Sequence, residues 1–190
     1  MSEVEEERRH AAQLPEGDVI AVLLEQHARI RELFSAVKDA PDGSRAEVFD
    51  RLRSLLAVHE TSEELVLRPV ADEDEWQEIA DARNAEEKAA NQVLAELENL
   101  DPATESFVAT LEALEKSVNE HAKAEETEEF PRVLAACDEE QRQKMGKRLL
   151  SVQRMAPTHP HPMAAGSPAA QLATGPFAAM VDRVRDALSR

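Results

Sequence analysis

Cysteine and tyrosine are nearly absent from this chain of 190 residues: Cys137 is the only cysteine, and no tyrosine occurs. One cysteine excludes an internal disulfide and a zinc site built from several cysteines. The five glycines do not form a phosphate-binding loop, because neither GxGxxG nor GxxxxGK(S/T) spacing is present. The HExxH and GxSxG motifs are also missing, which excludes the zinc-protease and nucleophile-elbow signatures.

Positive charge and long apolar runs are also scarce. The chain has 22 Lys and Arg against 39 Asp and Glu, and its formal net charge of -17 repels nucleic-acid phosphates and anionic lipids. The longest purely apolar stretch near the acidic amino terminus covers residues 19–24, far short of a membrane span. We therefore expect a cytoplasmic protein, and we expect neither nucleic acid nor a membrane as its partner.

The residue types that are abundant favour helices, and apolar residues recur at steps of three and four along the chain. This periodicity predicts four long helices, between residues 18 and 41, 44 and 69, 76 and 101, and 107 and 125. Because each is about 20 residues long and the connections are short, the pattern predicts an all-α fold. The expected architecture is an up-down-up-down antiparallel four-helix bundle, followed by a shorter fifth helix over residues 139–155.

Several helix ends can be read from the sequence. Asp18 is suited to cap the first helix, and Pro41 stands where that helix should stop. Ser44 and Glu47 have the spacing of a capping box and predict the start of the second helix. Pro69 should close it.

Composition divides the chain into four parts. They are a flexible acidic amino terminus (1–17), the bundle domain (18–156), a Pro-rich linker (157–175) and a carboxyl-terminal amphipathic helix (176–190). The last helix is expected to dock either on the bundle or on a protein partner, and the sequence does not choose between these. His159 and His161 lie in the linker, where we expect them to be solvated.

Three histidines, His27, His59 and His121, fall on the buried faces of the predicted helices. Glu63 follows His59 by four residues, and Glu125 follows His121 by four, so each pair shares one face of its helix. The two segments repeat the pattern His-x3-Glu-Glu-x4-Pro, which indicates an internal duplication. Imidazoles and carboxylates that meet in a dry bundle core are costly without a partner, and a divalent metal ion would supply one.

The segments LLEQHARIRELF, LLAVHETSEELVLRPV and NEHAKAEETEEFPRV resemble the hemerythrin-like HHE cation-binding family. The resemblance covers about residues 18–155, and the tail ending in GPFAAMVDRVRDAL is similar to tails of actinobacterial members. It implies a non-haem di-iron centre inside the bundle. If the family's ligand pattern is transferred to the matching positions, His27, His59 and Glu63 would hold one iron. Glu63 and Glu125 would bridge to a second iron held by His121.

The chain departs from the family pattern on its third helix, where the expected histidine is missing. Register places Glu87 in that slot, so Glu87 is a candidate oxygen ligand. The alternative is that Glu87 forms an ion pair with Arg83, four residues earlier. A second position rich in carboxylates favours oxidised iron, which makes reversible oxygen carriage a weaker expectation than sensing or peroxide chemistry.

Three function classes remain open at this stage. The first is an iron protein that binds or senses O2, NO or peroxide, or that handles iron. The second is an enzyme in which the same centre turns over peroxide or nitric oxide. The third is a metal-free helical interaction module, for which the acidic helix faces and the terminal helix are the argument.

Overall fold

The computed structural model describes residues 2–67, 74–154 and 158–159, and the side chains of residues 74–77 lie outside this description. Helices account for nearly all of the described chain, which contains no strand. They are α1 (Glu3–Ala11), α2 (Val19–Asp39), α3 (Asp42–Val66), α4 (Asp74–Leu97), α5 (Glu105–Ala124), α6 (Phe130–Ala136) and α7 (Glu139–Gln153), with a π-helical turn (Glu125–Glu129) between α5 and α6. None of the described helices is long and apolar enough to cross a membrane.

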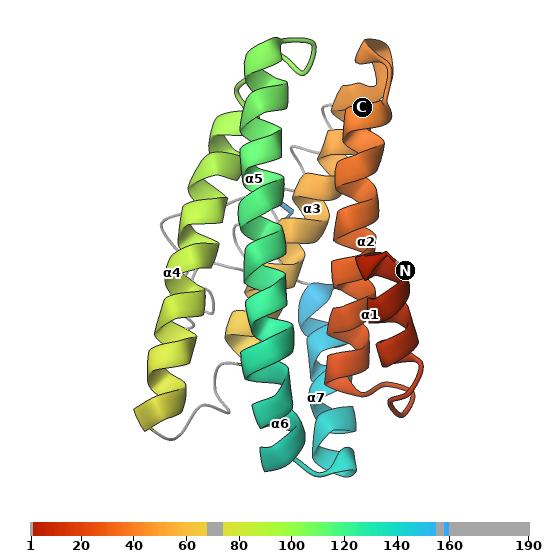
Figure 1. The fold of residues 1–190 in the computed structure, drawn as a ribbon, viewed down its shortest axis with the longest axis vertical. Helices are drawn as coiled ribbons and strands as arrows, with labels where there is room; N and C mark the ends of the chain where they lie inside the picture. Colours follow the sequence, from red (N-terminus) through yellow and green to blue (C-terminus); the bar gives the residue numbers. More distant parts are fainter. Residues whose placement is uncertain (1, 68–73, 155–157, 160–190) are drawn as a thin grey trace.

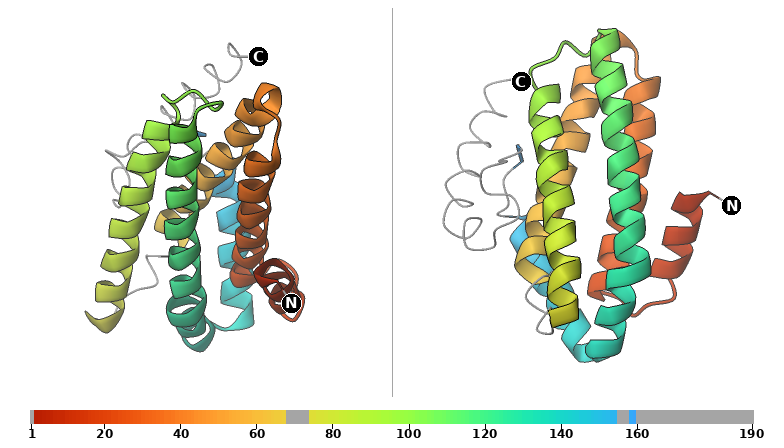
Figure 2. Two further views of the ribbon diagram at one scale, coloured as in Figure 1. Left: turned by 45° about the horizontal axis from the view of Figure 1, so that its top comes forward. Right: turned by 60° about the vertical axis from the view of Figure 1, so that its left-hand side comes forward.

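The four long helices form the predicted antiparallel bundle. Figure 1 shows α2 running up, α3 down, α4 up and α5 down, with α6 continuing below α5. The shorter α7 packs against α2 and α3 at the lower end of the bundle, and α1 lies along the lower half of α2 (Figures 1 and 2). The all-α class and the bundle architecture predicted from the sequence are confirmed.

The apolar core is divided into two clusters along the bundle axis. The upper cluster includes Ile30, Leu56 and Val118, and the lower cluster includes Leu24 and Phe130. Between the two clusters, buried polar side chains lie on several elements: His27 on α2, His59 and Glu63 on α3, and Glu125 in the turn after α5. A polar layer therefore interrupts the core at one level, between apolar clusters above and below it.

The structure differs from the prediction at the amino terminus. Residues 3–11 are not flexible but form α1, whose first turn is fixed by a capping box between Ser2 and Glu5. Glu7 and Ala11 are buried against the bundle, and Glu7 Oε1 accepts a 2.6 Å hydrogen bond from Nε of Arg31 on α2. The acidic composition does not predict this ion pair, because Arg31 lies 24 residues from Glu7 in the sequence.

One helix start agrees with the sequence prediction and another differs from it. The cap at Asp18 is confirmed, since its side chain accepts a hydrogen bond from the backbone N–H of Ile20. The second helix, however, starts at Asp42, because the Pro41 carbonyl accepts bonds from the backbone N–H groups of Ser44 and Arg45. Ser44 therefore lies inside the first turn and does not cap it. The predicted end of that helix at Pro69 lies outside the described residues.

The fourth long helix extends further than predicted. At its lower end the Phe130 N–H donates to the Glu125 carbonyl, five residues back, which widens one turn into a π-helix. Pro131, which has no N–H to donate, follows directly in the first turn of α6. The fifth predicted helix is confirmed as α7.

Two residues of the predicted linker, Thr158 and His159, contact the bundle. His159 is buried, and its Nδ1 is hydrogen-bonded to the Glu98 carboxylate, while Arg53 donates a 2.8 Å bond to the Thr158 carbonyl. The expectation that His159 is solvated is wrong, because a buried arginine and a glutamate of the bundle bind the chain here. His161, the rest of the linker and the predicted terminal helix lie outside the described residues.

Candidate metal centre

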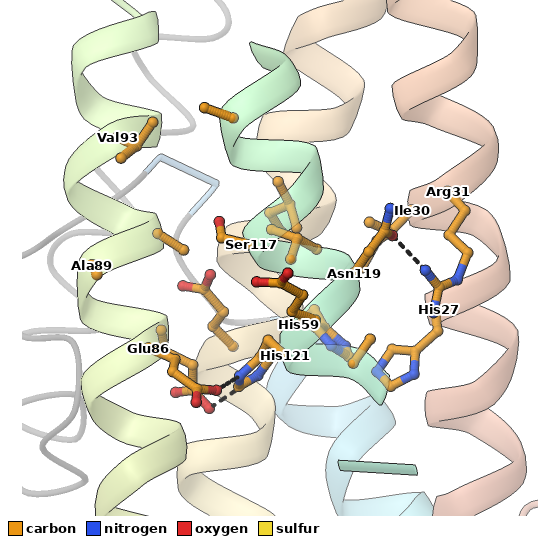
Figure 3. Close-up of a pocket in the computed structure, with 18 residues that line it drawn as sticks. His27, Ile30, Arg31, His59, Glu86, Ala89, Val93, Ser117, Asn119 and His121 are labelled. Atoms are coloured by element: carbon orange, nitrogen blue, oxygen red, sulfur yellow. Dashed lines mark hydrogen bonds and ion pairs between the residues drawn. The ribbon is translucent and has the colours of Figure 1, made fainter. Parts of the chain in front are cut away.

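Three histidines from three helices meet in the polar layer. His27 comes from α2, His59 from α3 and His121 from α5, and Figure 3 shows their rings converging at one end of a cavity. The rings of His27 and His59 pack edge to face with centroids 5.1 Å apart, and the ring of His27 stacks on Phe130. His27 and His59 are 2% and 4% exposed, so bulk water does not reach them freely.

Each histidine is oriented by a hydrogen bond from Nδ1 to a side-chain oxygen of another helix. The three pairs, each 2.8 Å apart, are His27–Glu126, His59–Gln26 and His121–Glu86. Because these oxygens accept, Nδ1 carries a proton, and in the neutral ring the Nε2 lone pair is directed to the other side. Metal-binding histidines are typically held in this way by a second layer of acceptors.

The Nε2 atoms all face buried carboxylates. Glu125 lies between two rings, with Oε2 3.3 Å from His27 Nε2 and Oε1 3.3 Å from His121 Nε2. His59 Nε2 lies 3.4 Å from Glu63 Oε2. Within the described part of the chain, Nε2 of His27 and Nε2 of His121 are buried and make no hydrogen bond of good geometry. These atoms are therefore available as metal ligands.

Among the described residues the donor atoms form three groups, of which two share carboxylates and the third consists of Glu7, His27 and Glu126. In each group every donor atom lies within 4.8 Å of the others. The first group is His27, His59, Glu63 and Glu125, and the second is Glu63, Glu87, His121 and Glu125. Two carboxylates therefore belong to both groups, which is the arrangement that two adjacent metal positions with shared bridging ligands require.

Glu87 lies where the register on the third predicted helix places it. It is 1% exposed on α4, and its Oε1 is 3.8 Å from Nε2 of His121. Arg83, the alternative partner considered from the sequence, forms an ion pair with Glu86, at 3.1 Å from Nη2 to Oε1. All six residues singled out from the sequence are thus brought together at the level of the polar layer.

The charges of the site shift the pKa values of its imidazoles. Burial lowers the pKa of His27, but the carboxylates of Glu125 and Glu126 outweigh burial and raise it above the usual value. Burial also opposes protonation of His121, and there the carboxylates of Glu125, Glu86 and Glu87 raise the pKa well above the usual value. Without a metal ion, protons partly balance the negative charge of this layer, and a metal ion would displace them.

A fourth buried carboxylate borders the centre. Glu60, next to His59, points into the same cavity and is hydrogen-bonded to Asn91 of α4. Burial and the nearby charge of Glu87 raise the pKa of Glu60 well above the usual value. Helical spacing alone does not place Glu60 with Glu63, because Glu60 lies about 100° around the helix from His59.

The sequence did not identify the residues that hold the histidines. A signal is visible in retrospect: Gln26 precedes His27, Glu126 follows Glu125, and Glu86 precedes Glu87. Each of these neighbours binds the histidine of a different helix. The donor set fits a metal ion, since imidazole nitrogen and carboxylate oxygen together suit the divalent metals from manganese to zinc.

Comparison with known proteins agrees with the site. Residues 18–133 match the family model of the hemerythrin HHE cation binding domain. An uncharacterised hemerythrin-like protein of Schizosaccharomyces pombe is 24% identical over 172 residues, which cover 88% of this chain and 85% of the relative. No solved structure matches the chain. Because the family match extends over most of the bundle, this chain belongs to the hemerythrin HHE cation-binding family.

Proposed function

We propose that this chain is a non-haem iron protein that holds a pair of iron ions and binds or senses a small ligand such as O2, NO or peroxide. The observation that carries the proposal is the sharing of Glu63 and Glu125 between the two groups of donor atoms. A carboxylate with two oxygens can bridge adjacent metal ions. The remaining donors are His27 and His59 at the first position and His121 and Glu87 at the second.

The balance of charge supports a metal-loaded state over a metal-free interaction module. Four buried glutamates, Glu60, Glu63, Glu87 and Glu125, lie at one level of the bundle. Burying ionised carboxylates costs several kcal/mol each unless they are compensated, so an apolar core would be the more stable choice for a purely structural bundle. Metal ions would provide the compensating charge, and the choice of iron rests on the family resemblance.

When bound, iron would supply redox chemistry and a coordination position for the small ligand. The protein's own side chains orient the ligands and shape the surroundings of the site. Glu126, Gln26 and Glu86 fix the ring orientations, and the apolar clusters on both sides limit the access of water. The second position has one imidazole and three carboxylates, a hard donor set that favours oxidised iron, so ligand sensing is proposed in preference to reversible oxygen carriage.

Metal analysis of the purified protein tests this proposal. Protein expressed in iron-replete medium should contain about two iron ions per chain and absorb in the near ultraviolet. His59→Ala and His121→Ala should each lose iron, because each removes a nitrogen donor. His10→Ala is the matched control, since His10 is an exposed histidine on α1. Metal-free wild-type protein, or normal iron in both histidine variants, would contradict the proposal.

A further inference from the structure

A cavity of about 410 Å³ extends from the candidate metal centre into the upper half of the bundle. Its polar end is formed by the three histidines and by Glu60 and Glu87 (Figure 3). A water molecule takes up about 30 Å³ in the liquid, and a diatomic molecule is of similar size. The cavity is therefore more than ten times larger than O2 or NO requires.

The cavity has one long apolar wall. On α4 the lining runs upward from Glu87 to Ala90 and Val93, a rise of about 9 Å along the helix. Ile30 and Leu56 line the cavity from α2 and α3. A ligand that follows this wall would therefore have its polar end at the histidines and its apolar part among aliphatic side chains.

Small side chains line the side of the cavity that faces solvent. Ala89 on α4 and Ala113 and Ser117 on α5 line the cavity and are exposed to solvent. Larger residues at these three positions would narrow the space between the two helices. The cavity therefore reaches the surface between α4 and α5.

From these three observations we infer that the cavity binds a small organic molecule with an apolar body and one terminal oxygen, such as a hydroxyl or hydroperoxide group. The inference deepens the proposed function and rests on it, because the terminal oxygen would lie at the metal positions. An apolar protein cavity of about 150 Å³ is enough for benzene, so 410 Å³ accommodates a molecule of roughly ten non-hydrogen atoms. Pockets of this size and polarity are typical of small-molecule sites.

Binding of a series of straight-chain 1-alkanols by calorimetry tests the inference without requiring turnover. From butanol to octanol the affinity should rise about fourfold per methylene group, and the rise should stop when the chain exceeds the cavity. Ala90→Phe, which fills the cavity from α4, should abolish the dependence on chain length. Ala113→Leu, at the entrance, should weaken binding of the longer alkanols. Ala109→Leu is the control, because Ala109 is exposed on α5 and does not line the cavity.

Iron content and thermal unfolding are measured on the same samples, so that the two proposals fail separately. Alkanol binding that is absent, or equal in wild type and Ala90→Phe, would overturn the inference and leave the iron proposal standing if iron is present. Alkanol binding with the expected dependence on chain length in protein that takes up no iron would support the cavity and overturn the proposed metal centre. If Ala90→Phe does not fold, the binding of the longer alkanols by Ala113→Leu provides the test.

Discussion

Oε1 of Glu126 lies 2.8 Å from Nδ1 of His27, and this contact joins the end of the fourth long helix to the first. Glu126 is the residue after Glu125, whose own carboxylate lies 3.3 Å from the opposite nitrogen of the same ring. Two successive residues of the π-helical turn therefore lie against the two ring nitrogens of one imidazole. The hydrogen bond gives Glu126 a role in orienting His27.

We predict that Glu126→Ala lowers iron affinity about 10- to 100-fold, because the ring of His27 loses the acceptor that fixes it. Iron titration of the metal-free protein measures the change. Glu128→Ala is the matched control, since Glu128 is exposed in the same turn. Equal affinities for the two variants would show that Glu126 does not position the site.

Glu87→Ala should reduce the iron content from about two ions to about one, because Glu87 belongs to only one of the two groups of donor atoms. Arg83→Ala should leave the iron content unchanged, since Arg83 forms its ion pair with Glu86. Glu87→His, which restores the family pattern, should keep both ions. Unchanged iron content in both Glu87 variants would remove this residue from the site.

The folded state of the metal-free protein should become less stable as the pH rises above 6.5. His27 and His121 have raised pKa values, so their protonated forms stabilise the folded state below that pH. This contribution is lost as the pH rises through the raised values. Metal-loaded protein should not show the loss, and metal at about 100 times its Kd should add about 2.7 kcal/mol. Thermal unfolding between pH 6 and 9, with chelator and with metal, measures both effects.

Glu7 provides a further pH test beside the candidate centre, since its carboxylate is grouped with His27 and Glu126. Burial raises the pKa of its carboxyl to about 7, and the Arg31 guanidinium opposes this only in part. Because the folded state binds the proton more tightly, wild type should lose up to about 3 kcal/mol relative to Glu7→Gln between pH 4.5 and 7. Glu6→Gln, at an exposed position of α1, should follow wild type. Parallel unfolding curves for wild type and Glu7→Gln would contradict this assignment.

Helical periodicity was sufficient to predict the bundle and to bring six polar residues to one level of it. Period and register determine which face of a helix is buried, and His27, His59 and His121 each fall on such a face. The position of Glu87 could be predicted in the same way. Whether it binds a metal ion or pairs with Arg83 could not, because the family pattern has a histidine there. These predictions depend on residues that repeat along one helix.

Features that depend on contacts between distant segments could not be predicted. The docking of α1 rests on the pair Glu7–Arg31, and the orientation of His59 rests on Gln26, which lies 33 residues away. The π-helical turn depends on how the chain accommodates Pro131 at the end of a packed helix. Periodicity shows which residues face inward but gives neither rotamers nor partners in another helix.

Anomalous diffraction at the iron edge from crystals of the iron-loaded protein tests the central claim most directly. The account predicts two iron peaks in the polar layer, with Glu63 and Glu125 between them, His27 and His59 at one peak, and His121 and Glu87 at the other. A single peak, or iron bound only outside this layer, would contradict the account of a shared two-metal centre.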